Sequence, residues 1–313
     1  MTILETLVEQ YPIRKTKKQK EAFREWAVAY AQSLGYSAQV EKKGSSHNIV
    51  IGDPETAEVV FGGHYDTPPG MPVPNFITPR NIPVFLMYQI GLALLMILPG
   101  IVVGALCGWL VGTLTGAAET GAMAGALITM VCMYAIIGLM MFGPANRSNV
   151  NDNTSGTAAV LELLTRLPEK QRSKAAFILF DNEEKGMLGS AGYASKHKTV
   201  KTEKLVVNMD CVGDGEHMLF IANRKTRALP SYEKLAAAIG AQTGCEAHFF
   251  KAEGGVYPSD QANFTLGMAV CACKRAKSIG FYCDRIHTRK DTVCRQENLD
   301  FLADGLSAFV ESL

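Results

Sequence analysis

The stretch Ala175-Ala-Phe-Ile-Leu-Phe-Asp-Asn-Glu-Glu-Lys-Gly-Met-Leu-Gly-Ser190 decides the fold and points to the chemistry. Its first part, Ala175–Phe180, has the length and apolar composition of a buried β-strand. The adjacent acids Glu183 and Glu184 follow it. At a strand end, one carboxylate can hold a metal ion while its neighbour moves a proton, a division of labour that metal-assisted hydrolysis needs. The alternative is that the two acids are an ordinary solvated pair on the surface. The rest of the chain decides between these two interpretations.

Strand-like apolar runs alternate with helical patterns along most of the chain. The expected strands are 37–41, 48–51, 59–61, 175–180, 205–209, 247–250 and 268–273, and the expected helices are 17–34, 154–167, 188–195, 231–243 and 296–312. This alternation predicts an α/β fold in which helices cover both faces of a mixed, mostly parallel sheet. In such a sheet, functional side chains gather at the carboxyl ends of the strands.

The bulk composition argues against some classes of function. The 313 residues carry a net charge of +1, which gives no reason to expect a nucleic-acid partner. The eight cysteines show no compact disulfide pattern and no CxxC knuckle. We therefore expect free thiols in a reducing compartment. The minor alternative is a structural zinc site at Cys271, Cys273, Cys283 and Cys294.

A long apolar segment interrupts the alternating pattern. Between Asn81 and Asn146 the only charged residue is Glu119. Two apolar stretches run from Pro83 to Leu114 and from Ala122 to Phe142. As a helix, the second would extend roughly 30 Å, about the hydrocarbon thickness of a bilayer.

The first apolar stretch is longer than one crossing needs and contains Pro99-Gly100. It is either one kinked or tilted helix or a membrane-surface approach followed by a span. We predict a transmembrane helical hairpin at 82–142, inserted into a single domain made of 1–81 and 143–313. The alternative is a very hydrophobic buried hairpin in a soluble protein.

Charges at the ends of the insertion predict its orientation. Arg80 and Arg147 flank it, whereas the connecting loop carries only Glu119. By the positive-inside tendency, the domain attached to these flanks lies in the cytoplasm. The stretch Met1–Gln10 has an amphipathic helical pattern and no signal-peptide core, which agrees. We expect a plasma-membrane protein whose main domain faces the cytoplasm.

Glycines recur at helical spacing in the apolar insertion. They stand at Gly100, Gly104, Gly108, Gly112 and Gly116, followed by Gly121 and Gly125 in the second stretch. Small residues at this spacing let helices approach closely in lipid. They are expected to pack the two spans together or to join two copies in a homo-oligomer. The alternative is the general glycine content of membrane helices.

Imidazole and carboxylate side chains follow the predicted strands where these end. The set comprises His64, Asp66, Asp152, Glu183, Glu184, Asp210 and His287. Nitrogen and oxygen ligands without a thiolate suit Zn²⁺, Co²⁺ or Mn²⁺ at a hydrolytic site. Single residues also have ordinary interpretations: Asp152 as a helix N-cap, Asp210 as the start of a turn and His287 as a loop histidine. The ordered set as a whole favours a metal site.

In these motifs the chain resembles the co-catalytic zinc aminopeptidases of the bacterial leucyl and Streptomyces type. The motifs that carry the resemblance are His64-Tyr-Asp66, Asn151-Asp-Asn-Thr-Ser-Gly156, Glu183-Glu-Lys-Gly-Met-Leu-Gly-Ser190, Met209-Asp210, Ser259-Asp260 and Ile286-His-Thr288. The resemblance covers the chain from about Lys17 to its end, except the apolar insertion. It implies a zinc-exopeptidase-like fold and two Zn²⁺ ions.

The resemblance also implies which residues hold the metals. His64 and Asp210 would hold one Zn²⁺, and Glu184 and His287 the other. Asp152 would bridge both ions. Two such ions activate a water molecule by lowering its pKa toward ~7, and the second ion would bind the free α-amine of a peptide.

Two further roles follow from the resemblance. Glu183 would act as general acid/base, and Asp66 would orient His64, as carboxylates orient metal-bound imidazoles. One position departs from the family pattern: relatives often carry a tyrosine before the last histidine, where this chain has Ile286. The source of an oxyanion donor is therefore open.

The sequence thus predicts a membrane-anchored zinc aminopeptidase that hydrolyses the N-terminal bond of peptides. A related zinc amidohydrolase, carboxypeptidase or deacylase is the second interpretation. A non-catalytic scaffold of the same fold is the third, and the complete ligand set argues against it. A transporter is disfavoured because the two spans offer no ionisable path.

Overall fold

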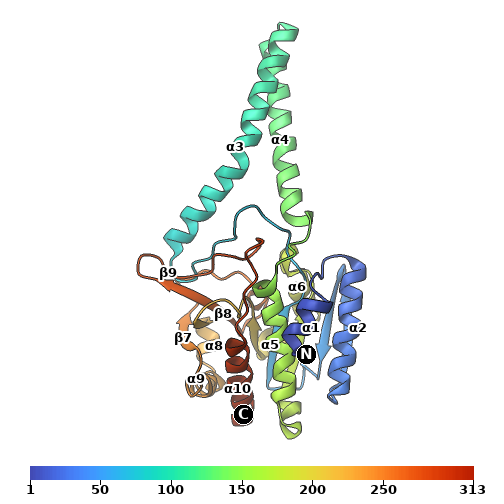
Figure 1. Cartoon of the computed structure of the whole chain (residues 1–313), viewed down its shortest axis with the longest axis vertical. Coiled ribbons are helices and arrows are strands. Elements are labelled where there is room, and N and C mark those ends of the chain that lie inside the picture. Colours follow the sequence, from blue (N-terminus) through green and yellow to red (C-terminus); the bar gives the residue numbers. More distant parts are fainter. The chain divides into compact units, whose positions relative to one another are not determined.

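The computed structural model describes all residues from Met1 to Leu313, and the chain forms two compact units. The first unit contains residues 1–82 and 145–313, and the second contains residues 83–144. Figure 1 shows the first unit as a sheet with helices and the second as a helical hairpin. The second unit coincides with the apolar insertion.

The first unit is built on a nine-stranded sheet with the order β1-β2-β4-β3-β5-β8-β6-β7, and β9 pairs with β8. The strands are β1 (Ala38–Lys43), β2 (Ser46–Ile51), β3 (Val59–His64), β4 (Ala175–Phe180), β5 (Leu205–Met209), β6 (His217–Ala222), β7 (Glu246–Lys251), β8 (Gly267–Ala276) and β9 (Gly280–Tyr282). The neighbours β4, β3, β5 and β8 run parallel, as do β6 and β7, and the remaining pairs are antiparallel. The carboxyl ends of β4, β3, β5 and β8 therefore meet at one edge.

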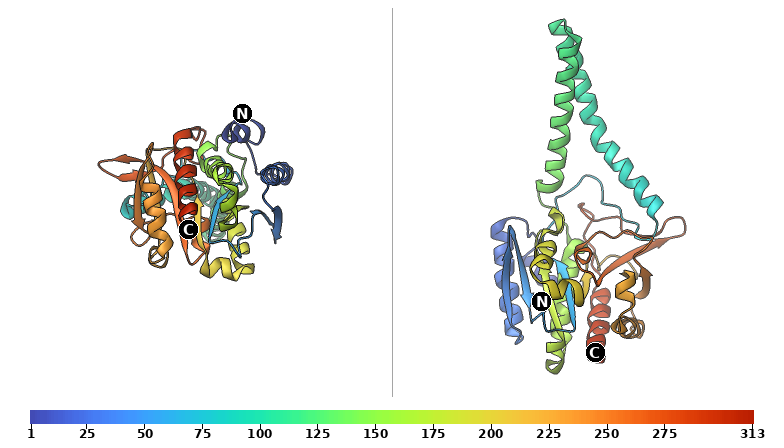
Figure 2. Two further views of the ribbon diagram at one scale, coloured as in Figure 1. Left: turned by 90° about the horizontal axis from the view of Figure 1, so that it is seen from below. Right: turned by 180° about the vertical axis from the view of Figure 1, so that it is seen from behind.

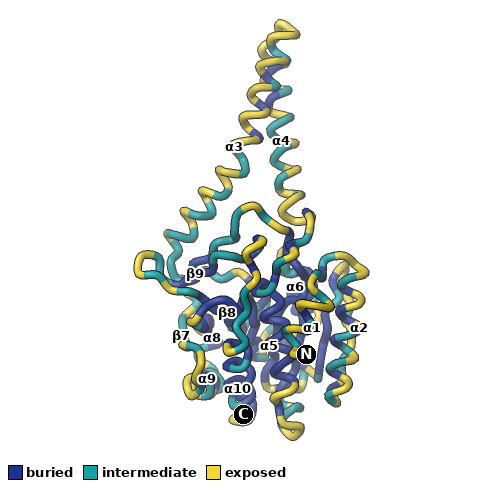
Figure 3. The backbone as a smooth tube through the Cα atoms, in the orientation of Figure 1, coloured by how far each residue is buried: buried dark blue, intermediate teal, exposed yellow.

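The central strands are buried on both faces. Every residue of β3, β4 and β5 is buried, whereas the edge strand β1 is mostly exposed. Continuous apolar runs such as Ala175–Phe180 are typical of parallel strands that are covered on both sides. Figure 3 shows this contrast between the buried interior strands and the more exposed periphery.

Helices cover both faces of the sheet, as predicted. One core is formed by side chains of α1, α2, α5, α9 and α10. On the opposite face of the sheet, a second core contains Tyr193, Ala194 and Val200 from α6 and α7. The two layers of helices are visible in Figure 2. The helices are α1 (Ile3–Gln10), α2 (Lys17–Ser33), α5 (Gly156–Arg166), α6 (Leu188–Lys196), α7 (Lys198–Glu203), α8 (Arg224–Arg227), α9 (Pro230–Gly240) and α10 (Gln296–Ser312).

The second unit consists of α3 (Ile82–Thr115) and α4 (Ala118–Phe142). The first apolar stretch is one continuous helix that contains Pro99. Both helices are long and apolar enough to cross a membrane. Large apolar side chains point outward along both, including Trp109 at 69% and Met123 at 74% exposure.

Glycines bring α3 and α4 together. A Cβ atom at Gly108 would lie 2.7 Å from the carbonyl oxygen of Gly121, and one at Gly104 would lie 2.6 Å from that of Gly125. No side chain larger than hydrogen fits at these crossings without separating the helices. These glycines therefore pack one helix of the chain against the other, and their use between two copies stays a prediction.

The structure contains two strands that the sequence analysis did not predict. Strand β6 is six residues long and apolar after His217, and periodicity alone does not separate such a run from a buried helix segment. At three residues, β9 is too short for alternation to be visible. Both strands lie beside β8, and the chain that follows β9 leads to His287.

Candidate active site

The fold brings the predicted ligands together from five separate segments. His64 ends β3, and Asp210 directly follows β5. Glu184 lies in the short helical turn η3 (Glu183–Lys185) after β4. Asp152 lies in the irregular segment η1 (Val150–Ser155), and His287 lies in the loop after β9. The cluster therefore forms at the carboxyl ends of the parallel strands.

The two carboxylate oxygens of Asp152 face two different histidines. Its Oδ1 lies 3.3 Å from Nε2 of His64, and its Oδ2 lies 3.0 Å from Nε2 of His287. A second carboxylate stands beside each imidazole: Asp210 Oδ1 lies 3.7 Å from His64 Nε2, and Glu184 Oε2 lies 3.6 Å from His287 Nε2. The five side chains thus form two groups that share Asp152.

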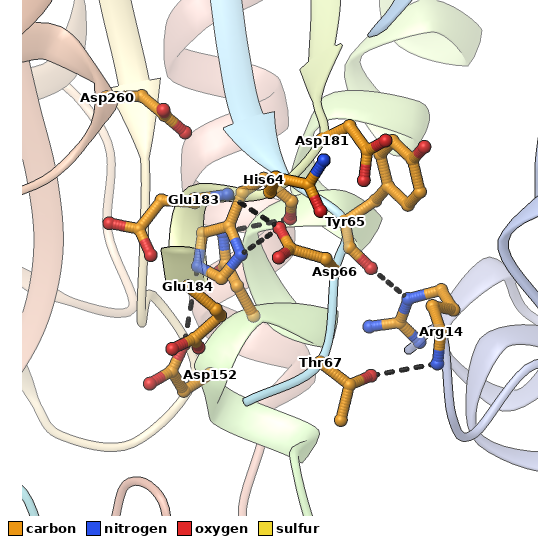
Figure 4. Close-up of polar contacts among 12 residues, drawn as sticks. Arg14, His64, Tyr65, Asp66, Thr67, Asp152, Asp181, Glu183, Glu184 and Asp260 are labelled. Carbon is orange, nitrogen blue, oxygen red and sulfur yellow. Dashed lines mark hydrogen bonds and ion pairs between the residues drawn. The ribbon is translucent and has the colours of Figure 1, made fainter. Parts of the chain in front are cut away.

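Asp66 lies behind His64. One of its oxygens is 3.5 Å from His64 Nδ1 and accepts a hydrogen bond from the backbone N–H of Glu183 at 3.0 Å. Lys20, a buried residue of α2, lies 3.9 Å from the other oxygen of Asp66 and donates to Asp181 and Asn182. Figure 4 shows the contacts from the carboxylate of Asp66 to His64 and to the backbone nitrogen of Glu183. Asp66 therefore connects the imidazole to the backbone of the paired acids.

The amides on either side of Asp152 fix its backbone. The side-chain oxygen of Asn151 accepts from the N–H groups of Gly213 and Asp214. The side-chain nitrogen of Asn153 donates to the carbonyl oxygens of His64 and Met209. These bonds explain why amides flank the acid: each supplies hydrogen bonds that a buried irregular backbone otherwise lacks.

Asp291 supports the same segment from the opposite side. Its two carboxylate oxygens accept from the backbone N–H groups of Asn151 and Asp152, at 2.8 and 3.1 Å. Helix α5 begins at Gly156, and its N-cap is Ser155. Asp152 is therefore not the helix N-cap that its position before a helix could also have indicated.

The site holds more buried carboxylates than cations. Burial raises the pKa of Glu183 well above its ordinary value, and the nearby carboxylates of Glu184 and Asp260 add to the rise. Burial also raises the pKa of Asp260 to about 7. Burial alone would lower the pKa of His64, but the neighbouring carboxylates of Asp152, Asp210 and Asp66 raise it well above its ordinary value.

The donor set fits divalent zinc. Glu184 Oε1 and Asp210 Oδ1 are buried and have no hydrogen-bond partner. Ligand atoms of His64, Asp152 and Glu184 lie within 4.8 Å of one another. Buried acceptors that face each other without donors are unfavourable, and a cation among them removes the conflict. Imidazole and carboxylate are ordinary zinc ligands.

The proline-rich segment 67–82, which precedes the hairpin, lies along the loop that carries His287. The backbone N–H of Met71 donates to the carbonyl of His287, and Asn75 donates to Ile286. Ile77 and Cys283 exchange two further backbone bonds. This segment is therefore fixed to the loop that carries one of the two histidines.

Arg14 connects the segments on either side of the insertion. It is fully buried, and its side chain donates to the carbonyl of Tyr65 and to the hydroxyl of Thr154. Its backbone N–H donates to the hydroxyl of Thr67. Figure 4 shows Arg14 beside Tyr65 and Thr67. Nothing in the sequence pattern marks this arginine as buried.

The sequence analysis missed several residues that shape the site. Asp291 lies four residues after His287, in the same loop, but only its contacts show what it does. Asp260 stands in a quoted motif without an assigned role, and its carboxylate lies close enough to affect Glu183. Ile286 is buried and supplies no donor, whereas the hydroxyl of Tyr257 donates to the carbonyl of Asp210 at 2.9 Å.

Comparisons with known proteins agree with this fold. The model of Peptidase family M28 matches residues 140–309. A Bacteroides thetaiotaomicron glutaminyl cyclase bound to N-acetylhistamine is similar in structure, with a TM-score of 0.59 and 14% identity over 99% of this chain and 96% of that one. A leucine aminopeptidase precursor from the same species gives a TM-score of 0.56 and 14% identity over 99% and 95%.

A third similar structure is the LapA aminopeptidase of Legionella pneumophila, with a TM-score of 0.56 and 15% identity over 98% of this chain and 69% of that one. A search of curated proteins finds no match. At these identities the structural likeness establishes the fold.

Proposed function

The chain belongs to peptidase family M28, and from this premise we propose that it is a zinc-dependent aminopeptidase, which removes the N-terminal residue of peptides. The observation that carries the proposal is the position of Asp152, whose two oxygens face His64 and His287. A carboxylate in that position suits a bridge between two metal ions. His64 with Asp210 would complete one ion's ligands, and His287 with Glu184 would complete the other's.

Bound zinc would supply a Lewis acid that lowers the pKa of a water molecule and polarises the scissile carbonyl. Glu183 would take the proton of the attacking water and pass it to the leaving amine. Its pKa is raised by burial and by neighbouring carboxylates, which favours a group that holds a proton between these two steps. Asp66 would keep the ring of His64 in its orientation.

The second Zn²⁺ would bind the neutral α-amine of the substrate, as the family resemblance implies, and this would direct cleavage to the N-terminal bond. A carboxypeptidase would need a cation that binds the C-terminal carboxylate. Lys20 donates to Asp181 and Asn182, and Arg14 is fully buried against backbone and hydroxyl groups, so neither of these two buried cations is free.

A second candidate is the cyclisation of N-terminal glutamine with release of ammonia. Solved structures of glutaminyl cyclases match this fold about as well as those of aminopeptidases do. Both reactions begin with a free α-amine, so the proposed recognition of that group serves either one.

We further propose that α3 and α4 form a membrane anchor and that the catalytic unit faces the cytoplasm. Both helices expose large apolar side chains along their length, which water disfavours. The chain leaves the first unit and returns to it, so the number of crossings is even. The charges of Arg80, Arg147 and Glu119 favour a cytoplasmic catalytic unit.

The test of function uses three matched peptides with the zinc-reconstituted protein. The first has a free amine and an apolar first residue, the second is its N-acetylated form, and the third begins with glutamine. We expect release of the first residue from the free peptide and at least about a hundredfold less from the acetylated one. Ammonia from the glutamine peptide without amino-acid release would establish the second candidate instead. Release of the C-terminal residue would contradict both.

A further inference from the structure

A second group of metal-binding side chains lies on strands β6 and β7. His217 begins β6, and Glu246 and His248 lie in β7. The two strands run parallel, with His217 opposite Glu246 and Leu219 opposite His248. Because side chains alternate along a strand, His217, Glu246 and His248 share one face of the sheet. Strand β7 is the edge strand and pairs only with β6.

The ligand atoms of these three residues converge. Nδ1 of His217 lies 3.0 Å from Oε2 of Glu246, and Nε2 of His248 lies 3.3 Å from Oε1 of the same carboxylate. The two ring nitrogens are 3.1 Å apart. Around a tetrahedral zinc with bonds near 2.0–2.1 Å, neighbouring ligand atoms are about 3.3 Å apart. The two nitrogens are close to that spacing from each other, and each is close to it from one of the two oxygens of Glu246.

Protons explain only part of the convergence. If both ring nitrogens carry a proton, each can donate to its own oxygen of Glu246, but the two N–H groups then lie with their nitrogens 3.1 Å apart and no acceptor between them. If only one of them carries a proton, the other nitrogen has no bond to Glu246. A divalent cation at the centre serves all three contacts at once.

His197 shows what an ordinary histidine–carboxylate contact looks like in this chain. Its Nδ1 lies 2.8 Å from Glu55, and its Nε2 lies 2.9 Å from Glu41. The two carboxylates lie at opposite nitrogens of the ring, so no single ion could bind both and the imidazole. His197 is 19% exposed and His248 is 18% exposed, which makes the two residues a matched pair.

Aromatic packing holds the two imidazoles in place. The ring of Phe281 lies 5.4 Å from that of His217 and 4.8 Å from that of His248. Ligands that packing has already oriented lose less freedom when a metal binds. Arg275 lies over the ring of Phe281 and is the nearby positive charge that opposes a cation.

We propose that His217, Glu246 and His248 form a separate site for a divalent transition metal such as Zn²⁺, which fastens the edge strand β7 to β6. Two imidazoles select zinc, nickel or copper over calcium or magnesium, which prefer oxygen. Glu246 is 59% exposed, so water reaches the site and can complete the coordination. The proposal does not depend on the catalytic assignment, because no residue is shared.

Zinc content tests the site directly. The full-length protein is stripped with a chelator, reconstituted with Zn²⁺ alone and desalted, and zinc per chain is measured by elemental analysis. The variants are His217→Gln, His248→Gln and Glu246→Gln, with His197→Gln as the control. We expect each of the three variants to hold about one zinc fewer per chain than the wild type, and the control to hold as many.

Two outcomes would overturn the proposal: equal zinc content in all the proteins, or zinc at this site that a single desalting step removes. Loss in the control as well would show that the change is not specific and would count against the site. Glu246→Gln changes a side chain that is mostly exposed, so misfolding is not an explanation for its loss of zinc. Far-UV circular dichroism of every variant verifies the fold.

Discussion

Asp152 lies in the middle of the site because hydrogen bonds hold its backbone and the residues on either side of it. Its backbone N–H is bound by Asp291, and the amides of Asn151 and Asn153 anchor the residues on either side. Its carboxylate is then free to face both histidines. A mutation at Asp152 therefore affects the ligand itself, whereas one at Asn151 or Asn153 would displace it.

Substitutions at Asp152 and Glu183 should separate metal binding from proton transfer. We expect Asp152→Asn to lose zinc and activity together, because one neutral amide replaces the shared ligand. Glu183→Gln should keep its zinc and lose turnover by a factor on the order of 10²–10⁴, because the proton carrier is gone. Elemental analysis and kcat for peptide hydrolysis measure both. Normal turnover in Glu183→Gln would contradict the role of this residue.

Arg14→Gln should destabilise the protein although Arg14 lies outside the ligand set. The change leaves the buried acceptors at Tyr65 and Thr154 without a donor, and each such group costs about 1–3 kcal/mol. We expect Tm to fall by at least about 4 °C. The control is Arg166→Gln, which removes exposed ion pairs with Asp300 and Asp304 and should shift Tm by less than about 2 °C. Equal shifts in thermal unfolding would contradict the account.

The sequence indicated the candidate ligands that the fold brings together, but not the residues that support them. Ligands such as His64 and Asp210 follow apolar strands, so their position along the chain already indicates one edge of the sheet. Arg14, Lys20 and Asp291 act through contacts with residues far away in the sequence, and their local patterns resemble those of surface residues. Only the folded chain reveals such partners.

At the scale of elements, the pattern of apolar residues predicted strands and helices well. The expected strand at 175–180 and the expected helix at 296–312 match β4 and α10 in the structure. Strand β6 was missed because five consecutive apolar residues after His217 do not define a period. The binding of the proline-rich segment to the loop of His287 rests on backbone hydrogen bonds, which carry no sequence signature.

Cysteine labelling tests the proposed topology of the hairpin. Glu119→Cys, in the connecting loop, should react with an impermeant thiol reagent added outside intact cells. Glu203→Cys, at the exposed end of α7, should react only after lysis. Both signals are measured above the background of the unmodified chain, whose native cysteines stay in place. Labelling of Glu203→Cys alone in intact cells would reverse the assigned orientation.

At the scale of the whole molecule, one sheet supports two groups of potential ligands with different environments. The group around Asp152 lies at the carboxyl ends of the parallel strands; its members His64, Asp152 and Asp210 are buried, whereas Glu184 and His287 are partly exposed. The group of His217, Glu246 and His248 lies on the outermost strand pair and reaches solvent. Burial strengthens electrostatic interactions, so the first group suits catalysis and the second suits a structural ion.

The central claim is that Asp152 bridges two zinc ions, and anomalous scattering at the zinc absorption edge tests it most directly. Crystals of the zinc-reconstituted protein should show two peaks about 3.5–4 Å apart, one on each side of this carboxylate. One peak should contact His64 and Asp210, and the other His287 and Glu184. A single peak among these residues, or two peaks that do not share Asp152, would contradict the account.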